Sequence, residues 1–173
     1  MAKQEALPPE LLAAMDSPFH MDDAERQHLK EIIATYGHMM FAGCGCLRPD
    51  GLIVSYTCGL TDRGLPEIMV SALHPQMAHV IVTELISQLP KIGPGDDGIE
   101  FTDIATHPAM LRRVPSDQAS RRILMKCVGY YGRDVDVMQL VLSDKESRYP
   151  WQQGPSQQFI EGQSPLVDWS KSD

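Results

Sequence analysis

The most constraining feature of the sequence is an alternating stretch, residues 52–60, which a polar turn connects to the start of a second strand near Glu67. On an extended chain, successive side chains point to opposite faces. One face carries the larger side chains Leu52, Val54, Tyr56, Cys58 and Leu60. The other face carries Ile53, Ser55, Thr57 and Gly59. Such a strand packs one face against a core, so we expect Tyr56 to be sequestered and the hydroxyl-bearing face to line a recess.

The order of the expected elements indicates an α+β fold. The pattern predicts helices at 22–36, 75–89 and 117–131 and strands at 38–47, 52–60, 67–73, 99–104, 110–114 and 135–142. Because most consecutive strands are joined by short turns, we expect a mostly antiparallel sheet of about six strands with three helices in a single domain. The last strand is strongly apolar, which favours a central position in the sheet.

Proline and glycine placement divides the chain into three parts. Residues 1–20 are typical of a flexible leader, residues 21–145 form the single α+β domain, and residues 146–173 form an extended C-terminal tail packed on it. We expect Trp151, and with it Trp169, to anchor this tail.

Charge excludes one class of partner. The chain has 15 basic and 23 acidic residues, a net charge of −8, so it lacks the basic footprint of a nucleic-acid binder. The short basic cluster of Arg112 and Arg113 with Arg121 and Arg122 is interpreted as a solvated face. No apolar run approaches the roughly 20 residues of a membrane span, and the N-terminus lacks the pattern of a secretion signal. We therefore expect a cytoplasmic protein without a membrane partner. The sequence does not decide between a monomer and a homodimer.

The cysteines first suggest a metal site. Thiolates are preferred ligands of zinc and iron–sulfur clusters, and Cys44, Cys46 and Cys58 lie near one another in sequence. A turn at 48–51 would place Cys44 opposite Ser55 and Phe41 opposite Cys58, so that Cys58 points away from the other two thiols. A bulge at Gly43 or Gly45 would change these faces and is the arrangement that would allow a shared metal site; without it we expect no metal. Cys44 and Cys46 are interpreted as unliganded core residues, with a redox-sensitive dithiol as the alternative.

Five residues are the candidate ligand-binding set: Tyr56, Thr57, Glu67, Gln139 and Trp151. Glu67 opens the third strand, where it would contact Arg63 or a ligand, or form only a surface ion pair. Gln139 interrupts an apolar run, so it either bridges to neighbouring backbone or lines a pocket with its amide. Trp151 either holds the tail in place or stacks on a planar ligand.

Nucleophilic catalysis requires a nucleophile, a base and an orienting acid within mutual reach. Ser55 and His38 share the expected face of the hairpin with Cys44 and Cys46, but the chain has no Gly-x-Ser-x-Gly elbow. The pattern does not define a catalytic set.

Several short motifs carry a resemblance when they are taken in order. They are Tyr36-Gly37, Tyr56-Thr57-Cys58-Gly59-Leu60, Pro66-Glu67, Tyr130-Tyr131-Gly132, Met138-Gln139-Leu140-Val141 and Tyr149-Pro150-Trp151. In this order and spacing the chain resembles a bacterial family known as domain of unknown function family 4262, over residues 36–151. The resemblance implies a small cytosolic bacterial domain. The family pattern does not require the cysteines at positions 44, 46 and 58, which weakens a metal site further.

The sequence thus predicts a binding or interaction module whose cleft accepts a small molecule or a segment of a protein partner. The alternative is a small enzyme that uses the same cleft, either a flavin-dependent oxidoreductase or a hydrolase. No cofactor is specified by the residues themselves.

Overall fold

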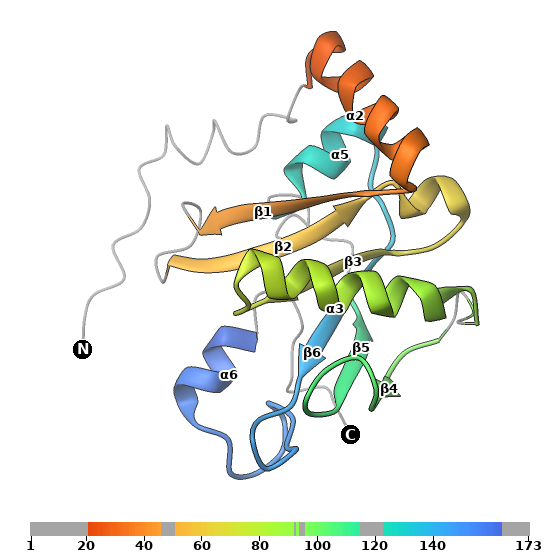
Figure 1. Cartoon of the computed structure of the whole chain (residues 1–173). Helices are drawn as coiled ribbons and strands as arrows, with labels where there is room; N and C mark the ends of the chain where they lie inside the picture. The colour runs from red at the N-terminus through yellow and green to blue at the C-terminus, as the bar shows by residue number, and fades with distance from the viewer. Residues whose placement is uncertain (1–20, 46–50, 92, 94–95, 115–122, 164–173) are drawn as a thin grey trace.

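One mixed sheet with helices on both of its faces forms the frame of the molecule (Figure 1). The structure is a computed structural model, and it describes residues 21–45, 51–91, 93, 96–114 and 123–163. Its elements are α2 (Asp23–Tyr36), β1 (Met39–Gly45), β2 (Gly51–Cys58), the 3-10 helix η1 (Leu60–Arg63), β3 (Glu67–Ser71), α3 (Pro75–Gln88), the 3-10 helix η2 (Leu89–Lys91), β4 (Ile99–Phe101), β5 (Ala109–Arg113), α5 (Met125–Tyr131), β6 (Val137–Leu142) and α6 (Gln157–Gln163).

The strands follow the order β1-β2-β3-β6-β5-β4. Neighbours pair antiparallel except β3 and β6, which run parallel. The predicted α+β class, the mostly antiparallel sheet of six strands and the central position of the last strand are confirmed. Within the segment expected to be an extended tail, residues 157–163 form the additional helix α6. The expected leader, residues 1–20, lies outside the described residues.

Alternation along the central strands builds a core on each face of the sheet. Ile68 and Val70 of β3 pack with Met138 and Leu140 of β6 beneath α3. Met69, which lies between the first two in sequence, packs on the opposite face with residues of α2 and α5. Figure 1 shows α3 in front of the sheet and α2 with α5 at the other side. None of the described helices is both long and apolar enough to cross a lipid bilayer.

The β1–β2 hairpin pairs in a different register from the predicted one. Phe41 lies opposite Tyr56 and not opposite Cys58, and the pairing is irregular between Gly43 and Gly45. Between Met39 and Gly43, the shift of two residues leaves the side chains on their predicted faces, because faces alternate with a period of two. Of the expected turn at 48–51, residues 48–50 lie outside the described residues, and Gly51 begins β2.

Gly59 ends β2 and changes the direction of the chain. Its φ of +120° is a conformation that side chains with a Cβ rarely adopt. A Cβ at this position would also lie 3.0 Å from the Cα of His38 and from the side chain of Ile33. Because the strand stops at this point, Leu60 leaves the face on which alternation placed it and packs in the α3-side core.

We predict that Gly59→Ala lowers the free energy of unfolding by at least about 2 kcal/mol, because it adds backbone strain to a contact with main-chain atoms. Gly64 is the matched control, since it also has a positive φ of +71° but no atom within 4 Å of an added Cβ. Gly64→Ala should cost about 1 kcal/mol. Urea unfolding of both variants measures the difference, and equal losses would contradict the role of the close contact.

Candidate functional site

A buried carboxylate organises the region where β2 ends and β3 begins. Glu67 is the first residue of β3 and is 0% exposed. Its Oε2 accepts a hydrogen bond from Thr57 Oγ1 at 2.6 Å. Its Oε1 accepts from the backbone N–H of Gly59 at 3.0 Å and from both the backbone N–H and the hydroxyl of Thr61, at 2.9 and 2.8 Å. Four donors converge on the two oxygens, which is the pattern of a carboxylate that acts as an acceptor only.

Thr57 connects this carboxylate to the sheet. While its hydroxyl donates to Glu67, its oxygen accepts from the backbone N–H of Ile68 at 2.8 Å. The backbones of β2 and β3 pair from Val54 to Tyr56. The Thr57 side chain therefore extends the connection between the two strands by one residue beyond this pairing. Removing a carboxylate that satisfies four donors leaves those donors unpaired in the interior, which is costly.

The expected roles of Glu67 are therefore corrected. The sequence suggested a contact with Arg63 or a ligand, or else a surface ion pair, but the side chain lies in the interior and bonds to Thr57, Gly59 and Thr61. The recess that the hydroxyl face was expected to line is also absent at Thr57, which is fully buried. The backbone amides of Gly59 and Thr61 take the place of the expected partner Arg63. Contacts to backbone amides cannot be predicted from a pattern of side chains.

Tyr56 lies in the core between the sheet and α5, as the alternation predicted. The side chain is buried, and its ring lies 5.6 Å from that of Phe41. Its hydroxyl oxygen accepts from the backbone N–H of Lys126 at 3.4 Å. Burial is the main cause that raises the pKa of this phenol above its usual value. Tyr56 thus holds α5 on the sheet.

A second polar group lies on the sheet near its other edge. The Trp151 and Tyr149 rings are stacked, with centroids 4.9 Å apart and planes inclined by 6°. The guanidinium carbon of Arg112 lies 5.1 Å from the Trp151 ring centroid, a distance at which a cation attracts a ring face. Arg112 Nε also lies 3.4 Å from Asp97 Oδ1. We call Arg112, Gln139, Tyr149 and Trp151 the Trp151 surface.

Gln139 joins this surface from β6. It is paired with Arg112 of β5 in the antiparallel register, so the two side chains leave the same face close together. The Gln139 amide nitrogen donates to the backbone oxygen of Gln163 in α6, which is the structural bridge that was one of its two predicted roles. The amide oxygen Oε1 is buried without a hydrogen-bond partner. Arg112 Nε has its ion pair with Asp97, whereas no partner is described for this acceptor.

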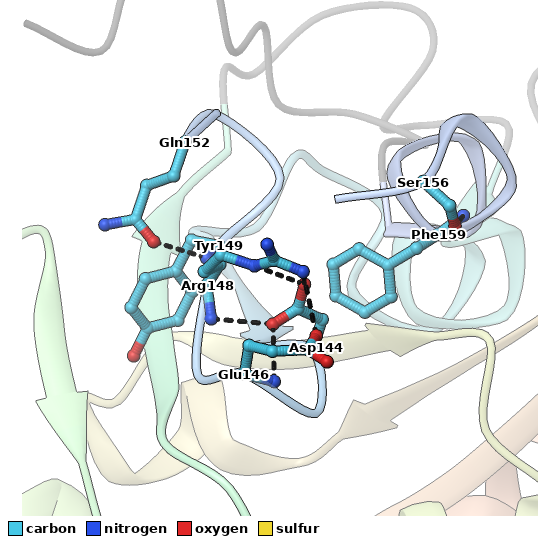
Figure 2. A network of polar contacts seen from close by, with 7 residues as sticks. All are labelled: Asp144, Glu146, Arg148, Tyr149, Gln152, Ser156 and Phe159. Carbon is cyan, nitrogen blue, oxygen red and sulfur yellow. Dashed lines mark hydrogen bonds and ion pairs between the residues drawn. The ribbon is translucent and has the colours of Figure 1, made fainter. Parts of the chain in front are cut away.

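A tight loop after β6 sets the position of Tyr149 (Figure 2). Asp144 Oδ1 accepts from the backbone N–H of Glu146 at 3.0 Å and of Arg148 at 2.8 Å, and Oδ2 accepts from Arg148 Nε at 2.9 Å. The Tyr149 backbone N–H then donates to Gln152 Oε1 at 2.7 Å. The Tyr149 hydroxyl donates to Glu100 Oε2 of β4 at 2.8 Å. The loop is thereby attached to the edge of the sheet.

The five predicted residues thus separate into two groups. Tyr56, Thr57 and Glu67 belong to the framework around the end of β2, whereas Gln139 and Trp151 belong to the Trp151 surface. Sequence reasoning missed two members of that surface. Arg112 was interpreted as part of a solvated face, but only 18% of its side chain is exposed. Tyr149 belonged to a motif of the family resemblance, and that motif was the available signal.

The cysteines whose side chains the structure describes, Cys58 and Cys127, are not part of a metal site. Among the described residues, no group of three or more His, Cys, Asp and Glu side chains could hold a metal ion. Cys58 and Cys127 are free thiols in the core. The side chains of Cys44 and Cys46 lie outside the described part of the chain.

Comparison with known proteins identifies a family. Residues 32–156 match the family model described as Domain of unknown function (DUF4262). No curated protein and no solved structure matches the chain.

We predict that Glu67→Ala lowers the free energy of unfolding by about 3 kcal/mol or more, because four donors lose their acceptor in the interior. Thr61→Ala is the matched control. It removes one hydroxyl donor and leaves the carboxylate in place, so its expected cost is about 1 kcal/mol. Chemical denaturation followed by circular dichroism gives both values. A loss below about 1 kcal/mol for Glu67→Ala would show that the carboxylate does not organise this region.

The contacts of Asp144 make the free energy of unfolding depend on pH. The hydrogen bond from Arg148 is the main cause that lowers the pKa of Asp144 below its usual 3.8. Because the folded-state pKa is the lower one, the stabilisation is fully present above the unfolded pKa and is lost as the pH falls through the folded value.

We therefore expect the melting temperature of Asp144→Asn to fall less between about pH 5 and about pH 2.5 than that of the unchanged protein. Glu146→Gln is the control, since it removes the other carboxylate that bonds to Arg148 and retains Asp144. Thermal melts across this range test the expectation. Parallel curves for Asp144→Asn and the unchanged protein would contradict it.

Proposed function

The chain belongs to the DUF4262 family, and we propose that it is a binding module whose ligand docks on the Trp151 surface. The ligand is a small molecule or a short segment of a protein partner. Tyr56, Thr57 and Glu67 serve as the framework, and Arg112, Gln139 and Trp151 make the contacts. The observation that carries the proposal is the buried, unpartnered amide oxygen of Gln139, on a strand position paired with Arg112, whose guanidinium lies against the Trp151 ring.

Gln139 Oε1 is the group that would make the proposed binding specific. A buried acceptor without a partner costs about 1–3 kcal/mol. The Gln139 amide nitrogen is already bound to the Gln163 backbone, so the amide cannot rotate freely to satisfy its oxygen elsewhere. Because Gln139 is fully buried, a ligand N–H or O–H reaches Oε1 only when the side chains that cover it move aside. Such a donor would offset that cost, and a ligand without it would not.

Trp151 and Arg112 supply the contact area. Stacking on Tyr149 and the neighbouring guanidinium hold the indole in one orientation before any ligand arrives. A ring that is already ordered loses little conformational entropy on binding, which is the advantage of preorganised anchors. Both Trp151 and Arg112 are only partly buried. A planar or apolar ligand face would therefore find a rigid partner at this place.

We infer a cytoplasmic setting and a bacterial source on the basis of the family resemblance, and the two free thiols in the core support a reducing compartment. The net charge of −8 makes a nucleic acid an unsuitable partner. A second copy of the chain stays among the candidate protein partners.

The test uses thermal shift and fluorescence in a Trp169→Phe background, which leaves Trp151 as the single tryptophan. A panel of small aromatic amides, together with flavin mononucleotide, is screened for compounds that raise the melting temperature and change the Trp151 emission. For each such compound, Gln139→Leu and Arg112→Ala should weaken binding about 10-fold or more, which corresponds to losing one buried hydrogen bond. Arg133→Ala is the matched control, because Arg133 lies 5.8 Å from the Tyr131 ring centroid, outside the proposed surface.

Equal binding by Gln139→Leu and the unchanged protein would contradict the proposal, as would an equal loss in Arg133→Ala. Flavin absorbance in the purified protein, or turnover of a bound compound, would instead favour the alternative of a flavin-dependent oxidoreductase or a hydrolase.

A further inference from the structure

Two thiols from distant parts of the chain meet in the core. Cys58 is the last residue of β2, and Cys127 lies in the first turns of α5. Both are free and fully buried, and they belong to the same apolar cluster. Tyr56 lies on the same face of β2 as Cys58, and its hydroxyl accepts from the backbone N–H of Lys126, the residue before Cys127. The Cys58 thiol is the largest cause of the raised pKa of Cys127, which indicates that the two thiols are neighbours. A redox-sensitive dithiol was expected at Cys44 and Cys46, whose side chains lie outside the described part of the chain.

Polar contacts join α5 to both β2 and α2. Lys126 N–H donates to Tyr56 of β2, and Lys126 forms an ion pair with Glu25 of α2. The Arg26 guanidinium of α2 donates to the backbone oxygen of Tyr130. The helix is only seven residues long, so its stability depends on packing and not on its own hydrogen bonds. A covalent bond at Cys127 would therefore change how firmly α5 is attached.

We propose that Cys58 and Cys127 are a redox-convertible dithiol, and that a peroxide oxidises the pair to a disulfide that fixes α5 on β2. The neighbouring thiol distinguishes this site from a solitary buried cysteine, because the second sulfur can resolve the product of the first oxidation.

The reaction balances with hydrogen peroxide as the oxidant. One sulfur, as thiolate, attacks an oxygen of the peroxide, the O–O bond breaks, and a sulfenic acid and one water result after proton transfer. The second sulfur attacks the sulfenic sulfur, the S–O bond breaks, and a second water leaves as the S–S bond forms. The two sulfurs together lose two electrons and two protons, and one peroxide is reduced to two waters.

Burial controls the rate of this conversion. Cys127 has a raised pKa, mainly because of the neighbouring Cys58 thiol and also because of burial, and a thiol that stays protonated is a poor nucleophile. Oxidation then requires local opening of α5, a motion available to short elements. The thiols should persist under ordinary reducing conditions and react when peroxide is sustained.

A disulfide between these positions would close a loop of 69 residues, the difference between 127 and 58. Closing a long loop restricts the unfolded chain and stabilises the folded one. For a domain of this size, the expected rise in melting temperature is about 5–10 °C. Because Cys58 adjoins the Gly59 amide that binds Glu67, the bond would also fix the framework at the end of β2.

The experiment uses the full chain with Cys44→Ser and Cys46→Ser, which leaves Cys58 and Cys127 as the only cysteines. The folded protein is treated with hydrogen peroxide, quenched, alkylated in denaturant and digested with trypsin without reduction. We expect peptide 127–133 linked to the peptide that ends at Arg63, a mass lower by two hydrogen atoms, and a melting temperature raised by about 5–10 °C that dithiothreitol returns to its starting value. Addition of Cys127→Ala to this background should abolish the link.

Three results would overturn the proposal. The first is separate sulfinic or sulfonic acids at the two positions without a link between them. The second is a disulfide that forms only after the protein is denatured. The third is a link that leaves the melting temperature unchanged or lowers it. If Cys127→Ala fails to fold, the mass and melting temperature of the parent Cys44→Ser, Cys46→Ser protein still decide the matter.

Discussion

The acceptance of four hydrogen bonds by the buried Glu67 carboxylate is the constraint on which the rest of the structure depends. A charge in the interior is tolerated only where donors replace the water it has lost. Meeting that requirement fixes the end of β2, the turn at Gly59 and the first residues of η1 in one arrangement. The same carboxylate opens β3, and the Glu67 backbone N–H donates to Asp136 just before β6. Glu67 thus joins β2 and η1 through its side chain and the start of β6 through its backbone.

The frame built around Glu67 separates stability from the proposed binding. Thr57 and Tyr56 form their hydrogen bonds inside the molecule, with backbone groups of β3 and α5. Gln139 lies on the neighbouring strand β6. Its amide nitrogen is hydrogen-bonded, whereas its amide oxygen is not. An unsatisfied acceptor on the strand position paired with Arg112, which itself lies against the Trp151 ring, is the arrangement expected of a preorganised recognition surface.

The fold could be predicted from the sequence where local patterns decide it, and the site could not where tertiary contacts do. Strand alternation placed Tyr56 in the core, and Asp22 and Gly37 marked the ends of the first helix, because capping is local chemistry. The hairpin register was wrong by two residues, since alternation defines faces but not alignment. Leu60 changed faces because Gly59 bends the chain, and the burial of Glu67 depends on backbone amides. Arg112 became part of a surface through Trp151, which is 39 residues away in sequence.

Hydrogen exchange at the backbone amides of Gly59 and Thr61 tests the central claim most directly. Both lie outside the strands, at a place where amides ordinarily exchange fast. If the Glu67 carboxylate holds them as described, they should exchange as slowly as the core amides of β3, at the rate set by global unfolding. Exchange as fast as that of an exposed loop amide would show that the carboxylate does not bind them, and the account would be wrong.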